Sequence, residues 1–193
     1  MIQLKNNTQI SAMRDAGRIT GEALLYAGEH VKPGVTTKHL DDLVHDYIVK
    51  QGAHPSFLGY GGFPGSACIS VNDEVIHGIP SKNRELHDGD VVKIDVGAYY
   101  RGYHGDSANT FIAGEGSPEA KRLVQVTKDS FYEGLKAVGY ALLVLFFVMG
   151  VVRTCGSFTE WKRPEIAFKG FLRFALAQAA VTWGMELMTG TFR

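Results

Sequence analysis

The sequence predicts an α+β domain over residues 1–138, followed by a segment of a different kind over residues 139–193. Apolar residues in the first fifty positions recur with helical spacing. Between Asp90 and Gly114, two runs rich in β-branched and aromatic residues meet at a short polar turn, which is typical of an antiparallel hairpin. Helices packed on an antiparallel sheet are therefore expected.

Two helices are expected before residue 52. The first begins after Asn7 or Thr8, either of which can cap it, and ends before the Lys-Pro-Gly sequence at 32–34. Its apolar stripe consists of Ile10, Met13, Ile19, Ala23, Leu24 and Ala27. The second helix is expected from Thr36 or Thr37 to Gln51. Its inward face consists of Leu40, Leu43, Val44, Tyr47 and Ile48.

The hairpin carries two aspartates that point to a metal site. If its turn is centred between Tyr100 and Arg101, Asp95 and Asp106 lie directly opposite each other, with Cβ atoms about 4.5–5.5 Å apart. Two carboxylates this close repel each other, and burial makes their ionisation costly unless a positive charge lies between them. A divalent metal ion would provide that charge.

Alternatives without a metal remain open for this pair. Aspartates near hairpins often cap turns or face water. Here both lie in the middle of predicted strands, where aspartate is disfavoured. Lys93 and His104 are also close enough in sequence to neutralise the pair by salt bridges.

Residues 56–81 combine a glycine-rich loop with a short strand and a histidine. The loop interleaves glycines with Phe57, Tyr60 and Phe63, which predicts either a buried turn or a rigid pocket with aromatic walls. The strand expected over 67–71 would hold it against the hairpin. His77 precedes a Gly-Ile-Pro turn, where an imidazole can act as acid, base or hydrogen-bond donor, with a purely structural role as the alternative.

Composition sets limits on partners and compartment. The 193 residues carry no formal net charge, so bulk electrostatics indicates no nucleic-acid or anionic-membrane partner. Cys68 and Cys155 form no CxxC motif, and residues 1–30 contain no signal-peptide core. A reducing cytoplasm is the expected location.

Residues 1 to about 138 resemble the first half of a type I methionine aminopeptidase, a metallopeptidase with the pita-bread fold. The phrases that carry the resemblance are GYGGFPGSACISVNDEVIHGIPS, DGDVVKIDVGAYYRGYHGD and SANTFIAG. The resemblance implies two pseudo-symmetric α+β halves around a two-metal site. It makes Asp95 and Asp106 metal ligands, with Asp106 bridging both ions. It makes His77 the catalytic histidine that contacts the scissile peptide, and it places Tyr60, Phe63 and Cys68 in the methionine side-chain pocket.

The resemblance also implies the chemistry. Two divalent ions, with cobalt, manganese, iron and zinc not distinguished by sequence, would activate water and polarise the scissile carbonyl. The substrate would be the N-terminal methionine of nascent proteins, whose thioether packs flexibly against aromatic rings. Association with the ribosome is left open. The HGIP and GYGGFP phrases favour the methionine-specific branch over prolidase-like and creatinase-like relatives.

The family pattern stops after Val138. An intact relative would continue with a second helix pair, a Gly-His-Gly segment and two glutamates that complete the metal site. Residues 139–193 contain no histidine and no aspartate, and their glutamates stand in no matching phrase. The alternative function is therefore a catalytically inactive, truncated or frameshifted family member that lacks the metal ligands of the second half, binds fewer metal ions and is a peptide-binding or misfolded fragment.

A sixteen-residue uncharged run, Ala137 to Val152, opens the unmatched tail. It is slightly short of the about 17–25 residues of a membrane-spanning helix. A buried helix, a shifted reading frame and a membrane anchor are the interpretations left open, with the membrane the least favoured. The remainder of the tail shows mild helical spacing.

Overall fold

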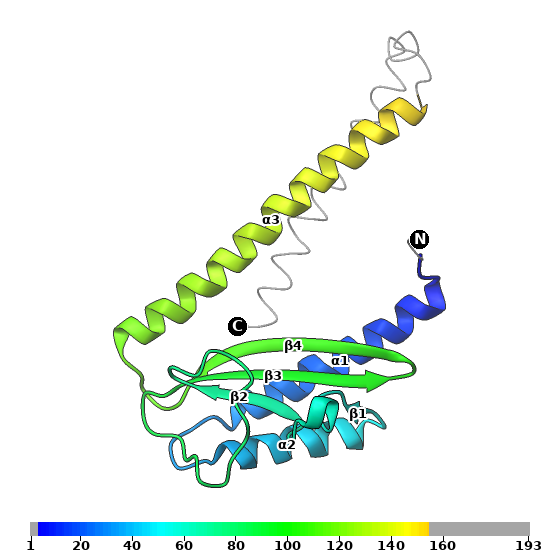
Figure 1. Cartoon of the computed structure of the whole chain (residues 1–193). Helices are drawn as coiled ribbons and strands as arrows, with labels where there is room; N and C mark the ends of the chain where they lie inside the picture. Colours follow the sequence, from blue (N-terminus) through cyan, green and yellow to red (C-terminus); the bar gives the residue numbers. More distant parts are fainter. Residues whose placement is uncertain (1–3, 155–193) are drawn as a thin grey trace. The chain divides into compact units, whose positions relative to one another are not determined.

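The structure, a computed structural model, describes residues 4–154. The chain divides into two compact units, Met1–Val124 and Gln125–Arg193, and each is described by itself. The first unit contains all the strands and the first two helices in the described part of the chain (Figure 1). The α+β class predicted from the sequence is confirmed.

Helix α1 spans Asn7–Glu29 and is capped one residue earlier than expected. The cap is Asn6 rather than Asn7 or Thr8. Its side chain accepts the Gln9 N–H at 2.9 Å, and the Gln9 side chain accepts the Asn6 N–H at 2.9 Å. This reciprocal capping box satisfies two amides that would otherwise lack partners, which explains the earlier start.

Helix α2 spans Thr37–Lys50 with Thr36 as its N-cap and Gln51 as its C-cap, which agrees with the helix expected from Thr36 or Thr37 to Gln51. Leu40, Val44 and Ile48 are fully buried, and Leu43 and Tyr47 pack at the edge of the core. The α1 stripe is only partly inward. Ile19, Ala23, Leu24 and Ala27 are buried, whereas Ile10 and Met13, nearer the N-terminal end, are exposed.

The sheet has β3 at its centre. Strand β3 spans Val91–Tyr100 and pairs antiparallel with β4 (Tyr103–Ile112), β2 (Ala67–Val71) and the short β1 (His54–Pro55). The predicted bounds of β2 are confirmed. Helices α1 and α2 lie against one face of this sheet (Figure 1).

The hairpin register differs from the prediction. Tyr100 pairs with Tyr103, so the turn is Arg101-Gly102 rather than a turn centred between Tyr100 and Arg101. Both turn residues have positive φ, 49° and 86°, as in a type I′ turn, whose backbone twist suits two-residue hairpins. The expectation that Asp95 and Asp106 are directly opposite is therefore wrong by two residues, because Asp106 pairs with Gly97.

The core lies between the helices and the sheet. Alternate residues of β3 point into it, and four of them, Val92, Ile94, Val96 and Ala98, are fully buried. Strand β2 contributes Ile69 and Val71. This alternation leaves the intervening residues of β3 on the opposite face of the sheet.

Helix α3 spans Pro118–Thr154 and contains the uncharged run from Ala137 to Val152. Within residues 4–154, no helix combines the length and apolar character needed to cross a membrane. The rest of the tail, with its mild helical spacing, lies outside the described residues.

Candidate metal and substrate site

Asp95 and Asp106 share the face of the sheet opposite helices α1 and α2. Asp95 pairs with Ala108, and Asp106 pairs with Gly97. Asp95 and Gly97 are two residues apart on β3, so both positions face the same side of the sheet. Because Asp106 pairs with Gly97, its side chain also lies on that side, as the diagonal neighbour of Asp95. This register shift of two residues therefore moves the two aspartates apart along the strands without separating them onto different faces.

The two carboxyl groups still interact. Burial raises the pKa of Asp95 above its ordinary value, and the charge of Asp106 together with a hydrogen bond between the two carboxyl groups raises it further. The His77 side chain acts in the opposite direction, which places an imidazole near the pair. Without a cation, ionisation of Asp95 is therefore less favourable than that of an isolated aspartate.

The two side chains considered as neutralising partners have other contacts. The Lys93 ammonium donates to the backbone oxygen of Asn72. The His104 Nδ1 atom lies 2.9 Å from the Ser56 Oγ atom. The electrostatic conflict at Asp95 therefore persists with Lys93 and His104 in place.

Cys68 lies directly opposite Asp95 on the neighbouring strand β2 and is 7% exposed. Burial, with the charges of Asp95 and Asp106 adding to it, raises the pKa of this thiol to about 11. A thiol with such a pKa stays protonated at neutral pH. Cys68 is therefore suited to line a pocket as a small neutral side chain.

His77 is held by its neighbour Gly78. The Gly78 N–H donates to the Ser70 Oγ atom at 2.9 Å, and the Gly78 carbonyl accepts the Ile69 N–H at 2.9 Å. A Cβ atom at position 78 would lie 2.2 Å from the Ile69 backbone oxygen, so glycine is required for this approach. His77 itself has φ of 59°, a conformation that costs energy for a non-glycine residue and is imposed here by the anchored neighbour.

The predicted pocket loop lies beside the aspartates, although its aromatic residues differ in placement. Tyr60, in the short 3₁₀ helix η1 (Tyr60–Gly62), is 82% exposed, and Phe63 is half-buried. The Phe57 ring covers Gly97, where an added Cβ would lie 2.7 Å from the ring. The loop thus reaches β3 at the position that pairs with Asp106.

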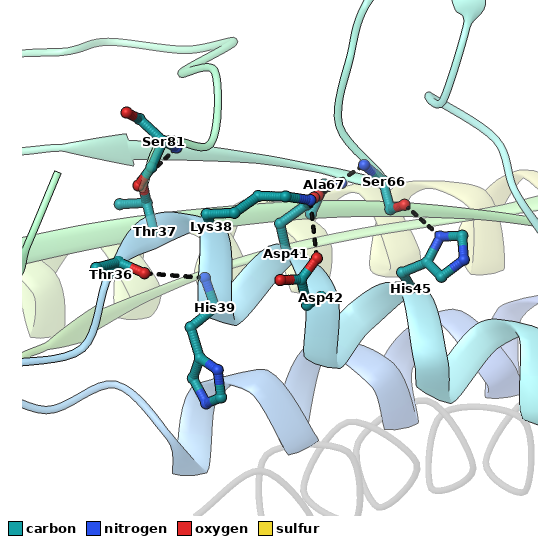
Figure 2. A network of polar contacts seen from close by, with 10 residues as sticks. All are labelled: Thr36, Thr37, Lys38, His39, Asp41, Asp42, His45, Ser66, Ala67 and Ser81. Atoms are coloured by element: carbon teal, nitrogen blue, oxygen red, sulfur yellow. Dashed lines mark hydrogen bonds and ion pairs between the residues drawn. The ribbon is translucent and has the colours of Figure 1, made fainter. Parts of the chain in front are cut away.

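Sequence reasoning missed two residues that fix this loop. The Ser56 N–H donates to the Gly97 carbonyl at 2.8 Å, and the Ser56 hydroxyl contacts His104. At the other end of the loop, the buried Asp41 carboxylate binds backbone N–H groups (Figure 2). Its position on the inner side of α2, among Leu40 and Val44, is a signal that could have identified it, since a buried acid requires partners.

The described residues fit a metal site in part. Asp95 and Asp106 offer hard carboxylate oxygens on one face, and their mutual repulsion is the kind that a cation relieves. Among residues 4–154, no three histidine, cysteine, aspartate or glutamate side chains gather closely enough to hold a metal ion. Two carboxylates alone make an open site, because divalent cations take four or more ligands.

Comparison with known proteins identifies the lineage. Residues 11–141 match the model of metallopeptidase family M24, and the chain belongs to this family. Within the family it is similar to methionine aminopeptidases. It is 56% identical to that of Clostridium acetobutylicum over 136 residues, which are 70% of this chain and 54% of the relative. It is 49% identical to methionine aminopeptidase 1 of Bacillus subtilis over 136 residues, again 70% and 54% of the two chains.

Solved structures agree. The crystal structure of methionine aminopeptidase from Rickettsia prowazekii superposes with a TM-score of 0.64 at 42% identity, covering 67% of this chain and 52% of that one. The resemblance stated from the sequence is confirmed, and so is the similarity to the pita-bread fold. The chain spans about half the length of the relatives it matches. The roles of individual site residues remain predictions.

Proposed function

We propose that this chain carries one half of a methionine aminopeptidase active site and that its reaction is the metal-dependent removal of N-terminal methionine from nascent proteins. The observation that carries the proposal is the pair formed by Asp95 and Asp106, whose carboxyl groups interact on the face of the sheet opposite α1 and α2. The similarity to methionine aminopeptidases over 70% of the chain supports it.

In this proposal, each part of the site has a distinct task. Asp95 and Asp106 would hold divalent cations, which supply Lewis-acid activation of water and of the scissile carbonyl when bound. His77, fixed through Gly78, would donate a hydrogen bond to the scissile peptide. Tyr60 and Phe63 would contact the methionine side chain, and the protonated Cys68 would avoid placing a third negative charge beside the aspartates.

The metal ion and the cellular setting belong to the same proposal. Carboxylate oxygens suit manganese, iron, cobalt or zinc, and two ions per site are expected by analogy with the family. The proposed substrate places the protein in the cytoplasm, where nascent chains emerge from ribosomes.

A second candidate is a catalytically inactive family member that binds peptide or fewer metal ions. The observation that favours it is the incomplete ligand set. In the described part of the chain the candidate ligands are Asp95 and Asp106, and residues 139–193 contain no histidine or aspartate. Reading the gene in its other two frames beyond codon 138 bears on this candidate directly. A Gly-His-Gly segment in another frame would show that the tail arose by a frameshift.

Metal titration combined with a peptidase assay separates the two candidates. Isothermal titration with Mn²⁺ and with Co²⁺ gives the number of tightly bound ions, and release of methionine from a Met-Ala peptide gives turnover. The first candidate predicts two ions and metal-dependent release that is lost in Asp106→Asn. Asp73→Asn, which removes an exposed acid between β2 and His77, is the matched control and should retain both. Fewer than two ions and no release would favour the second candidate.

A further inference from the structure

The strongest unexplained feature of the first unit is the buried carboxylate of Asp41 on α2. Its side chain is 2% exposed, and one oxygen, Oδ1, accepts two backbone N–H groups, from Ser66 at 2.6 Å and from Ala67 at 2.9 Å. The other oxygen, Oδ2, pairs with Lys38 at 2.7 Å. An acid taken out of water in this way requires strong partners, and all of these are charge-assisted hydrogen bonds.

These contacts lie where the pocket loop ends and β2 begins. Ser66 is the last residue of the loop over 56–66, and Ala67 is the first residue of β2. His45, one helical turn beyond Asp41, places its Nδ1 atom 2.9 Å from the Ser66 hydroxyl (Figure 2). Helix α2 therefore contacts Ser66 twice: Asp41 accepts its backbone N–H, and His45 contacts its hydroxyl group.

The loop is thus fixed to other elements at both ends. Between these ends, its hydrogen bonds are mainly to other residues of the loop. At its start, Ser56 is tied to Gly97 on β3. In the middle, the recorded backbone hydrogen bonds join loop residues to one another, as in Gly59 to Phe63 at 2.8 Å. The placement of the loop relative to Cys68, two residues after Ser66, therefore depends on the contacts of Asp41.

We propose that Asp41 is a positioning residue that holds the C-terminal end of the 56–66 loop at the start of β2 and thereby sets the width of the methionine pocket. The inference rests on the proposed function only in treating this loop as the pocket. The charge of Asp41 also contributes to the raised pKa of Cys68, which agrees with its place behind the pocket wall.

The chain offers a matched control for Asp41. Asp42 is the next residue of α2 and also pairs with Lys38, at 2.8 Å, but its side chain is 56% exposed. Asp42→Asn therefore removes an acid from the same lysine while leaving the bonds from Asp41 to Ser66 and Ala67 intact. Asp41→Asn keeps an oxygen that can accept these N–H groups, whereas Asp41→Ala removes both acceptors.

Amide hydrogen exchange of the full chain tests the inference without requiring turnover. In Asp41→Ala, exchange at Ser66 and Ala67 should accelerate at least about tenfold, because charge-assisted bonds to backbone amides are among the stronger ones. Asp41→Asn should give a smaller acceleration, and Asp42→Asn should match the wild-type chain. Exchange in the β3–β4 hairpin serves as the internal reference and should stay unchanged.

Two results would overturn the inference. One is a folded Asp41→Ala chain with wild-type exchange at Ser66 and Ala67. The other is an equal acceleration in the hairpin, which would mean that Asp41 stabilises the unit as a whole. If Asp41→Ala does not fold, Asp41→Asn decides by the same two criteria.

Peptide selectivity keeps this inference distinct from the proposed function. If the wild-type chain releases methionine, the ratio of kcat/KM for Met-Ala over Leu-Ala peptides should fall in Asp41→Asn and stay constant in Asp42→Asn. An unchanged ratio in Asp41→Asn would refute the role in the pocket. If the wild-type chain releases none, the enzymatic proposal fails, and the exchange experiment alone decides whether Asp41 positions the loop.

Discussion

On the face of the sheet that α1 and α2 cover, Val92, Ile94 and Val96 are fully buried, whereas the opposite face carries Lys93 and Asp95 at the intervening positions of the same strand. The covered face holds no charge, and the other face holds two interacting acids. A strand presents alternate residues to opposite faces, so one ten-residue segment supplies both surfaces. The face against α1 and α2 therefore contributes the stability of the core, and the opposite face carries the residues of the proposed chemistry.

The largest effect is expected on the covered face. Ile94→Ala removes a side chain that is 0% exposed and leaves a cavity between the sheet and the helices. Urea unfolding should show a loss of about 2–5 kcal/mol, the range for such truncations. Thr110→Ala, at the position of β4 that pairs with Lys93, is the control and should change stability by about 0.5 kcal/mol or less. Similar losses in both variants would break the comparison.

A smaller effect is expected where α1 approaches the sheet. An added Cβ at Gly105 on β4 would lie 2.4 Å from the Ala16 backbone oxygen and 2.5 Å from the Thr20 hydroxyl. Gly105→Ala should therefore destabilise the domain by about 1–3 kcal/mol, the usual cost of overpacking.

The control for that clash lies on the same helix. Gly21 of α1 has no atom within 4 Å of an added Cβ. Gly21→Ala should stabilise the domain by about 0.5–1 kcal/mol, because alanine is the better helix former. Thermal unfolding of both variants measures the two signs, and a stabilising Gly105→Ala would show that α1 does not pack closely on β4.

The smallest effect is expected on the face opposite α1 and α2, and it depends on pH. The pKa of Asp95 is raised above 3.8 by burial and by Asp106. Its contribution to folding is most favourable below pH 3.8 and is lost as pH rises through the folded-state value. When a chelator is present, Asp95→Asn should therefore melt at a slightly higher temperature than the wild-type chain at pH 7. This difference in melting temperature should vanish below pH 3.8.

Adding metal should reverse the difference in melting temperature between the wild-type chain and Asp95→Asn at pH 7. Mn²⁺ at saturating concentration should raise the melting temperature of the wild-type chain, since a ligand that binds only the folded state stabilises it. Asp95→Asn should gain less. A destabilising Asp95→Asn at pH 7 without metal would contradict the assignment of Asp95 and Asp106 as a repelling pair.

Much of the fold could be predicted because local rules dominate it. The start of α2 at Thr36 or Thr37, the bounds of β2 and the inward face of α2 follow from local residue preferences and periodicity. The start of α1 was missed by one residue because Asn6 and Gln9 form a reciprocal box that a single-residue preference does not reveal. The exposure of Ile10 and Met13 was missed because periodicity does not show where the sheet ends beneath the helix.

The candidate site could be predicted only as a set of residue types. Asp95, Asp106 and His77 stand in phrases that the family shares, so sequence indicates their chemistry. It did not give the hairpin register, because the choice between neighbouring two-residue turns depends on the positive φ that Arg101 tolerates beside Gly102. The sequence also did not reveal the hydrogen bond from the Ser66 N–H to Asp41, because these residues are twenty-five positions apart.

The sequence by itself determined helices α1 and α2, strand β2, the β3–β4 hairpin, the family and the pair of acids on the hairpin, since spacing along a chain is enough to fix periodicity and motif. Strand β1 and the start of α3 at Pro118 were not predicted. Only the tertiary structure decided which residues share a site. Asp95 became a diagonal neighbour of Asp106, Cys68 was placed opposite Asp95, and Asp41 was buried against a distant loop. Such contacts arise when separate segments pack, and their energies depend on burial and on partners that no local pattern contains.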